Sequence, residues 1–183
     1  MIAKHVTNKK QLMKALLAEE TFDRFELVSG SVDTFAEFSV DGRYNAAFFG
    51  KTADDNAGAE GDPSPNGHSE SSEGTPSERE FTPWQLLRPF FLSVIRGKNT
   101  PLSFKFVFRL PSDTTARLFE DEGIRIENGA VSGLLMNLTF DGTSILLTTG
   151  VSHRTFSMDR EPERVWDAWV ESFFGKTGID LSE

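Results

Sequence analysis

The run LSFKFVFRL, residues 102–110, decides how this chain folds. Bulky apolar and polar side chains alternate along it, which is the pattern of a β-strand with one buried face. Its three phenylalanines lie on one face, and the other face carries Lys105, Val107 and Arg109. The alternation therefore predicts a strand whose phenylalanine face is covered by a second layer of structure.

Two further segments, one before and one after this strand, have the pattern of β-hairpins. Each has strand-like runs on both sides of an Asp-Gly pair, at Asp41-Gly42 and at Asp141-Gly142. Asp-Gly between two such runs is a strong hairpin signal, because both central turn positions need positive φ. The predicted strands are residues 35–40 with 44–49, and residues 133–140 with 143–150.

The two hairpin segments also resemble each other. FSVDGRYNAAFFG (38–50) and LTFDGTSILLTTG (138–150) match in layout at an offset of 100 residues. One interpretation is an ancient duplication that gives the sheet an internal pseudo-twofold repeat. The other is chance, because the turn itself demands these residues in any hairpin of this kind. The sequence leaves both interpretations open.

Helical periodicity predicts four helices in the remaining segments. They span about residues 8–19, 83–95, 112–122 and 161–174. Pro89 lies inside the second helix, so a break or kink is expected near Arg88. Helices together with antiparallel hairpins predict an α+β fold in two layers, with the helices packed on one side of the sheet.

Residues 52–80 contain no large apolar side chain. Such a segment cannot bury enough surface to offset the entropy of ordering it, so we expect a disordered acidic insert whose ends lie close together. The insert carries eight acids and one base, which accounts for −7 of the formal charge of −9. The other 154 residues carry −2 and suffice for an ordinary core, so residues 1–183 are predicted to form one domain.

The composition argues against several classes of protein. The chain has no cysteine, which excludes disulfides and thiolate chemistry. It has neither a secretion signal nor a run of about 20 apolar residues, so a cytoplasmic protein of a bacterial kind without a membrane partner is expected. The near-neutral charge outside the insert argues against nucleic acid. No catalytic motif is present and the three histidines lack ligand spacing, so neither cofactor nor metal is predicted.

Arg88 is the first candidate for a binding residue. It occupies the apolar stripe of its predicted helix, between Trp84 and Phe91, where a charge needs a partner or an aromatic face. It could hold a carboxylate or phosphate of a ligand at a cleft. It could instead pair with an acid of the last helix, such as Asp167. The second, structural interpretation is favoured because buried charges are usually paired.

Three further residues are candidates. Lys105 and Arg109 share one strand face and could form an anion-binding patch, although charges on a half-exposed strand are more often simply solvated. His153 follows a polar run at the end of a predicted hairpin, and its ionisation suits acid–base work. Its neighbour Ser152 faces the opposite side of a strand, so the two residues do not make a nucleophile–base pair.

The chain also carries a scattered set of familiar residues: Trp84 with Arg88-Pro89, Gly97-Lys98, Pro101 with FKFVF (104–108), Gly133-Leu134 with Asn137, Thr149-Gly150, and Trp166-Asp167. In this combination it resembles an uncharacterised family of small bacterial proteins, a domain of unknown function found mainly in anaerobic Gram-positive bacteria. The resemblance covers nearly the whole chain apart from the insert, where this sequence is longer. It implies that Arg88 is a fixed feature, and it implies no activity, cofactor or catalytic residue.

The sequence thus favours a non-catalytic binding or interaction domain, with an unidentified protein or a small anion as its partner and a homodimer as an open alternative. A second hypothesis is a small enzyme or ligand-binding protein that uses a cleft near Arg88 for an anionic metabolite. A third is a weak single-stranded nucleic-acid binder that stacks bases on exposed phenylalanines beside Lys105 and Arg109.

Overall fold

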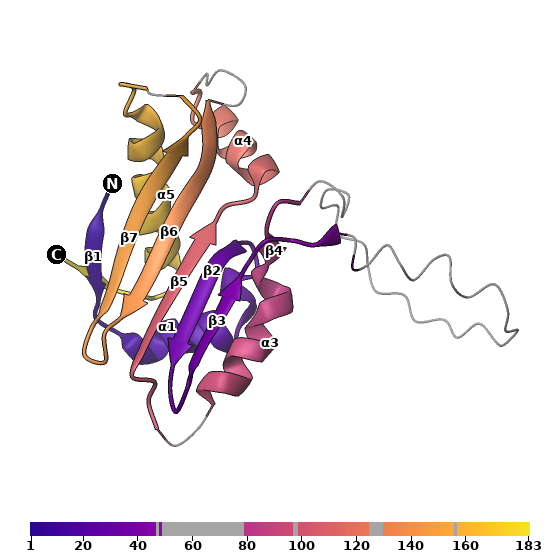
Figure 1. The fold of residues 1–183 in the computed structure, drawn as a ribbon. Helices are drawn as coiled ribbons and strands as arrows, with labels where there is room; N and C mark the ends of the chain where they lie inside the picture. Colours follow the sequence, from indigo (N-terminus) through magenta and orange to yellow (C-terminus); the bar gives the residue numbers. More distant parts are fainter. Residues whose placement is uncertain (47, 49–78, 97–98, 125–129, 156) are drawn as a thin grey trace, which may run out of the picture.

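Figure 1 shows the computed structural model of the chain, which describes residues 1–46, 48, 79–96, 99–124, 130–155 and 157–183. The strands are β1 (Ala3–Val6), β2 (Glu26–Asp33), β3 (Glu37–Asp41), β4 (Thr82–Pro83), β5 (Ser103–Arg109), β6 (Val131–Phe140), β7 (Ile145–His153) and β8 (Leu181–Ser182). The helices are α1 (Lys9–Leu17), α3 (Trp84–Ile95), α4 (Ser112–Asp121) and α5 (Glu161–Lys176), with a short 3-10 helix, η1 (Glu20–Phe22), after α1.

The described strands form one antiparallel sheet in the order β3-β2-β5-β6-β7-β1-β8, and β4 pairs with the beginning of β2. In Figure 1, α1 and α5 lie behind this sheet and α3 lies beside β2 and β3. No helix of the described chain lies over the face that is turned toward the viewer. The predicted two-layer α+β fold, with helices on one side, is confirmed.

The phenylalanine face of β5 is the centre of the core, as the alternation predicts. The three phenylalanines are each at most 3 % exposed. The rings of Phe106 and Phe108 lie 5.4 and 5.1 Å from the ring of Trp84 in α3, measured between centroids. Phe25 contacts Phe108 at 6.0 Å and Phe173 of α5 at 5.4 Å. Each such ring buries about 150–250 Å², so this aromatic cluster joins both helices to the sheet.

The predicted hairpin of the second half is confirmed. β6 and β7 pair along nearly their whole length, and Gly142 in the turn between them has a φ of 90°. The carboxylate of Asp141 accepts hydrogen bonds from the backbone N–H of Ser144 at 2.7 Å and of Thr143 at 2.8 Å. These hydrogen bonds lower the pKa of Asp141 and fix the turn.

The predicted hairpin of the first half is wrong. β3 pairs with β2 through a tight turn at residues 34–36, so that Asp41-Gly42 lies after the hairpin and is not its turn. β2 runs without interruption from Glu26 to Asp33. Gly42 is required for a different reason, because a Cβ there would lie 1.7 Å from the carbonyl oxygen of Leu27. The structure therefore does not show the internal repeat.

The predicted break in α3 is also absent, because the helix runs from Trp84 to Ile95 as one element with Pro89 inside it. Pro89 is exposed, so the carbonyl group that lacks its N–H can bond to water instead. The strands β1 and β8 are not predicted by the sequence pattern, since each is too short to show alternation. None of the described helices has the length and apolar character that crossing a bilayer requires.

α3 can lie close to β2 because Gly30 leaves room for it. A Cβ on Gly30 would lie 2.7 Å from the ring of Phe91 and 3.2 Å from that of Phe106, and both rings are fully buried. We expect Gly30→Ala to lower the free energy of unfolding by about 1–3 kcal/mol through overpacking, as measured by chemical denaturation. Gly175→Ala is the control, because a Cβ there meets nothing within 4 Å. Equal losses in the two variants would contradict the account.

The described residues before and after the predicted insert lie side by side. The backbone N–H of Tyr44 donates to the carbonyl oxygen of Glu80 at 3.0 Å, and Arg43 and Phe81 form an antiparallel bridge. The described segments on the two sides of the insert therefore pair with each other, which agrees with the expected closeness of its ends. Residues 52–78 of the predicted insert lie outside the described residues, and their predicted disorder stays a prediction.

Candidate functional site

A groove lies where α1 begins, and we call it the Lys9 groove. Its described walls are Lys9, Lys10 and Met13 of α1, residues 99–102, and the turn from β6 to β7. An inner hollow of about 300 Å³ adjoins an outer one of about 740 Å³, and both are lined by Lys9, Met13 and Phe140. Volumes of about 300–1,000 Å³ are usual for small-molecule sites, so the groove is large enough for a ligand.

The floor of the inner hollow is apolar. Leu17, Phe104, Phe140 and Ile145 line it, and each of these side chains is at most 5 % exposed. Ile95, at the end of α3, adds a further apolar wall. A ligand that buries apolar surface in this hollow would gain about 25 cal/mol of binding free energy per Å². The hollow therefore suits the apolar part of a ligand.

Two lysines stand at the rim. The Nζ of Lys9 donates to the carbonyl oxygen of Thr143 and lies 6.0 Å from the centre of the Phe140 ring, so Lys9 already has partners. Lys10 lines the outer hollow and is exposed, and its side chain makes no hydrogen bond or ion pair with the described residues. The first turn of α1 contains no acid, and the positive end of the helix dipole adds to the two lysine charges. The rim is therefore electropositive.

Hydrogen bonds hold the walls of the groove in place. The side chain of Asn8 caps α1 by accepting from the backbone N–H of Gln11 at 3.2 Å. The backbone N–H of Leu102 donates to the carbonyl oxygen of Asp33 at 2.8 Å. A Cβ on Gly142 would lie 3.0 Å from the carbonyl oxygen of Leu102, so the β6–β7 turn lies directly against the next wall. The groove is preformed.

Arg88, the first residue singled out from the sequence, is bound to groups of the protein itself. Its Nη2 lies 3.2 Å from Oδ2 of Asp23, and its Nη1 donates to the carbonyl oxygen of Glu19. Burial raises the pKa of Asp23, and the nearby Arg88 charge opposes that rise. The pairing of Arg88 with Asp167 predicted from the sequence is wrong, because Asp167 accepts a hydrogen bond from Thr149 instead.

Arg109 lies at the end of β5 with its side chain 9 % exposed. Its Nη1 pairs with Oε2 of Glu80 at 2.6 Å. Its Nη2 donates to Oγ of Ser112 at 3.1 Å and to the carbonyl oxygen of Ser132 at 2.9 Å. The guanidinium carbon also lies 5.2 Å from the centre of the Phe81 ring. Arg109 therefore ties the segment that follows the insert to the sheet.

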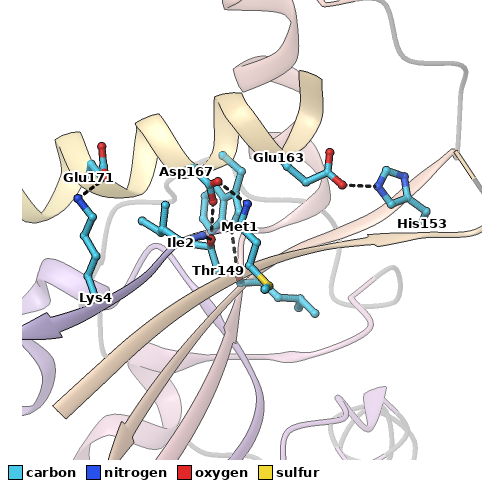
Figure 2. Close-up of polar contacts among 10 residues, drawn as sticks. Met1, Ile2, Lys4, Thr149, His153, Glu163, Asp167 and Glu171 are labelled. Atoms are coloured by element: carbon cyan, nitrogen blue, oxygen red, sulfur yellow. Dashed lines mark hydrogen bonds and ion pairs between the residues drawn. The ribbon is translucent and has the colours of Figure 1, made fainter. Parts of the chain in front are cut away.

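α5 turns a row of carboxylates toward β7 and β1, as Figure 2 shows. Asp167 accepts a hydrogen bond from Oγ1 of Thr149, and its Oδ2 lies 2.5 Å from the amino group of Met1. One turn further along, Glu171 pairs with Lys4 at 2.7 Å, and this hydrogen bond raises the pKa of Lys4. These contacts fasten α5 and β1 to the sheet.

His153 belongs to the same row. Its Nε2 lies 3.5 Å from Oε1 of Glu163, one turn before Asp167 on α5 (Figure 2). Ser152 points elsewhere, since its Oγ accepts a hydrogen bond from Oγ of Ser132 at 2.7 Å. The side chains of His153 and Ser152 thus have different partners.

One comparison with known proteins gives a result. A family model described as a family of unknown function (DUF5721) matches residues 15–182. The chain belongs to this family. The match confirms the resemblance inferred from the sequence, although not its bacterial detail. No curated protein and no solved structure matches the chain.

The structure of this family member does not bring the four predicted site residues together. Arg88 lies on α3 and is paired with Asp23, and Lys105 and Arg109 lie on β5. His153 is the last residue of β7 and contacts Glu163 of α5. Lys105 is exposed between the neighbouring strands of the sheet. The described residues hold no group of three or more His, Asp or Glu side chains that could bind a metal ion.

Sequence reasoning misses the Lys9 groove. Its walls come from three segments that lie far apart in the chain, and the matched family range begins after Lys9 and Lys10. The two adjacent lysines at the start of a helix are the available signal. In the sequence they look like the solvated face of an amphipathic helix, which is the commoner role of such residues.

Proposed function

We propose that this chain is a non-catalytic binding domain and that the Lys9 groove is its ligand site. The observation that carries the proposal is a preformed hollow with an apolar floor and a lysine rim. Ligand sites commonly combine apolar walls with a few polar groups that orient the ligand. The polar side chains of the described lining are lysine, hydroxyl and amide groups, which can form hydrogen bonds with a ligand.

The proposal moves the expected ligand site away from Arg88, because Asp23 and Glu19 already occupy that guanidinium. It also favours a small ligand over single-stranded nucleic acid. The third hypothesis relies on Arg109 beside exposed phenylalanines, whereas Arg109 is buried against Glu80 and the phenylalanines of β5 face the core. The cytoplasmic location and the homodimer stay part of the proposal, and cell fractionation and sedimentation test them.

Filling the groove is expected to abolish ligand binding. Met13→Trp places a larger side chain between the α1 wall and Phe140, so apolar fragments that bind the wild-type protein should lose their saturation-transfer NMR signals. We expect at least a tenfold loss of affinity, equivalent to about 1.4 kcal/mol. Thr100→Trp, on the opposite wall, should have the same effect with less risk to the core, since Thr100 is exposed.

Met158→Trp is the matched control, because Met158 is 87 % exposed and does not line the groove. It should leave fragment binding unchanged. Fragments that bind the two groove variants as well as the wild-type protein would refute the proposed site.

A further inference from the structure

The Lys9 groove separates apolar and charged surface along its length. The inner hollow meets the buried side chains of Phe104 and Ile145, whereas the outer hollow opens past Lys10 and Gly142. A ligand that fills both hollows therefore needs an apolar part inside and a polar part at the mouth. Lys9 lies over the boundary between them, above the ring of Phe140.

The charged side chains at the mouth of the groove indicate which charge the polar part of the ligand carries. The described lining contains two lysines and neither aspartate nor glutamate. The ammonium of Lys9 is already used by the carbonyl oxygen of Thr143, whereas that of Lys10 has no partner among the described residues. A ligand anion at the mouth would complete the hydrogen bonds of Lys10 and gain from the positive end of α1.

The inner hollow limits the shape of the apolar part. It holds about 300 Å³, and its walls come from α1, the end of α3 and the turn between β6 and β7. This volume is at the lower end of the usual range for ligand sites. A flexible unbranched chain suits such a space better than a rigid ring system, because it can follow the walls from Met13 to Ile95.

Resting on the proposed function, we propose that the ligand is a free straight-chain carboxylate of medium length. Its carboxylate pairs with Lys10, and its hydrocarbon chain lies over Phe140 into the inner hollow. Lys9 is a positioning residue, held by Thr143, that covers the first part of the chain. No bond is made or broken in this role.

The test is a calorimetric titration of the full chain with octanoate at pH 7.5 and low salt. Octan-1-ol is the neutral analogue of the same length, and acetate is the anion without a chain. Octanoate should bind more tightly than octan-1-ol, acetate should not bind, and added salt should weaken octanoate binding alone. Lys10→Met should reduce the affinity for octanoate about tenfold and leave that for octan-1-ol unchanged.

Lys105→Met is the matched control, because Lys105 is an exposed lysine on the open face of β5, outside the lining of the groove. It should leave both affinities unchanged. The ligand class is overturned if octanoate binds no better than octan-1-ol, or if the two lysine variants lose affinity equally. If neutral fragments still bind the wild-type protein and lose binding in Met13→Trp, the groove is a ligand site and only the proposed ligand class is wrong. If octanoate does not bind and neutral fragments bind Met13→Trp as well as the wild-type protein, the proposed function is overturned as well.

Discussion

Replacing Phe108 by alanine is expected to lower the free energy of unfolding by about 3–5 kcal/mol, as large aromatic-to-alanine changes in cores do. Phe108 is fully buried and contacts Phe22, Phe25 and Trp84 at centroid distances of 5.8, 6.0 and 5.1 Å. The lost ring would therefore remove contacts to η1, to the residue just before β2, and to α3. Chemical denaturation with a circular dichroism readout measures the loss.

Phe35→Ala is the control for this variant. Phe35 is 90 % exposed at the β2–β3 turn and contacts the ring of Phe38, so its removal should change the free energy of unfolding by less than about 1 kcal/mol. A small loss at Phe108, or an equal loss at Phe35, would contradict the placement of β5 at the centre of the core.

Arg109→Met is expected to cost about 1–3 kcal/mol, because it removes the guanidinium hydrogen bonds to Ser112 and Ser132 and leaves the buried carboxyl group of Glu26 without its opposing charge. Glu26 lies directly opposite Arg109 across the β2–β5 pair and is only 8 % exposed. Glu80 contributes less, since it is largely exposed and its charge is screened by water. Lys105→Met, four residues earlier on the same strand face and exposed, is the control and should have little effect.

The loss in Arg109→Met should depend on pH through Glu26. Burial raises the pKa of Glu26, and Arg109 is the largest opposing charge. A raised pKa favours the folded state below the unfolded value of about 4.3, and that gain disappears as the pH rises through the folded value. Removing Arg109 raises the pKa of Glu26 further, so the deficit should be larger at pH 7 than at pH 4. A deficit independent of pH, or one that Glu26→Gln in the same chain does not reduce, would contradict this role.

The sequence correctly predicts a helix or strand where the local residue pattern has the same cause as the role of those residues in the folded protein. The alternation of β5 sets its buried face, and Asp141-Gly142 forms the predicted turn because Gly142 needs positive φ there. Asp41-Gly42 is the same dipeptide, but its glycine is needed for another reason, because Gly42 must leave space for the carbonyl oxygen of Leu27. A dipeptide pattern cannot distinguish a turn from a close contact made elsewhere in the fold.

The candidate sites show the same limit. The sequence indicates that Arg88 needs a partner, and the structure supplies one in Asp23. The identity of that partner depends on how η1 and α3 pack, which no spacing reveals. The Lys9 groove depends even more on tertiary structure, because Lys10, Thr100 and Phe140 come together only through the sheet and α1.

The most direct test of the central claim, that this domain binds its ligand in the Lys9 groove, is chemical-shift mapping of the ¹⁵N-labelled chain during a titration with apolar fragments and octanoate. The account predicts that the largest shifts fall on Met13, Thr100, Leu102, Phe140 and Gly142, which line the groove. Shifts that gather instead around Arg88, Arg109 or His153, or the absence of shifts at the groove at saturating ligand, would contradict it.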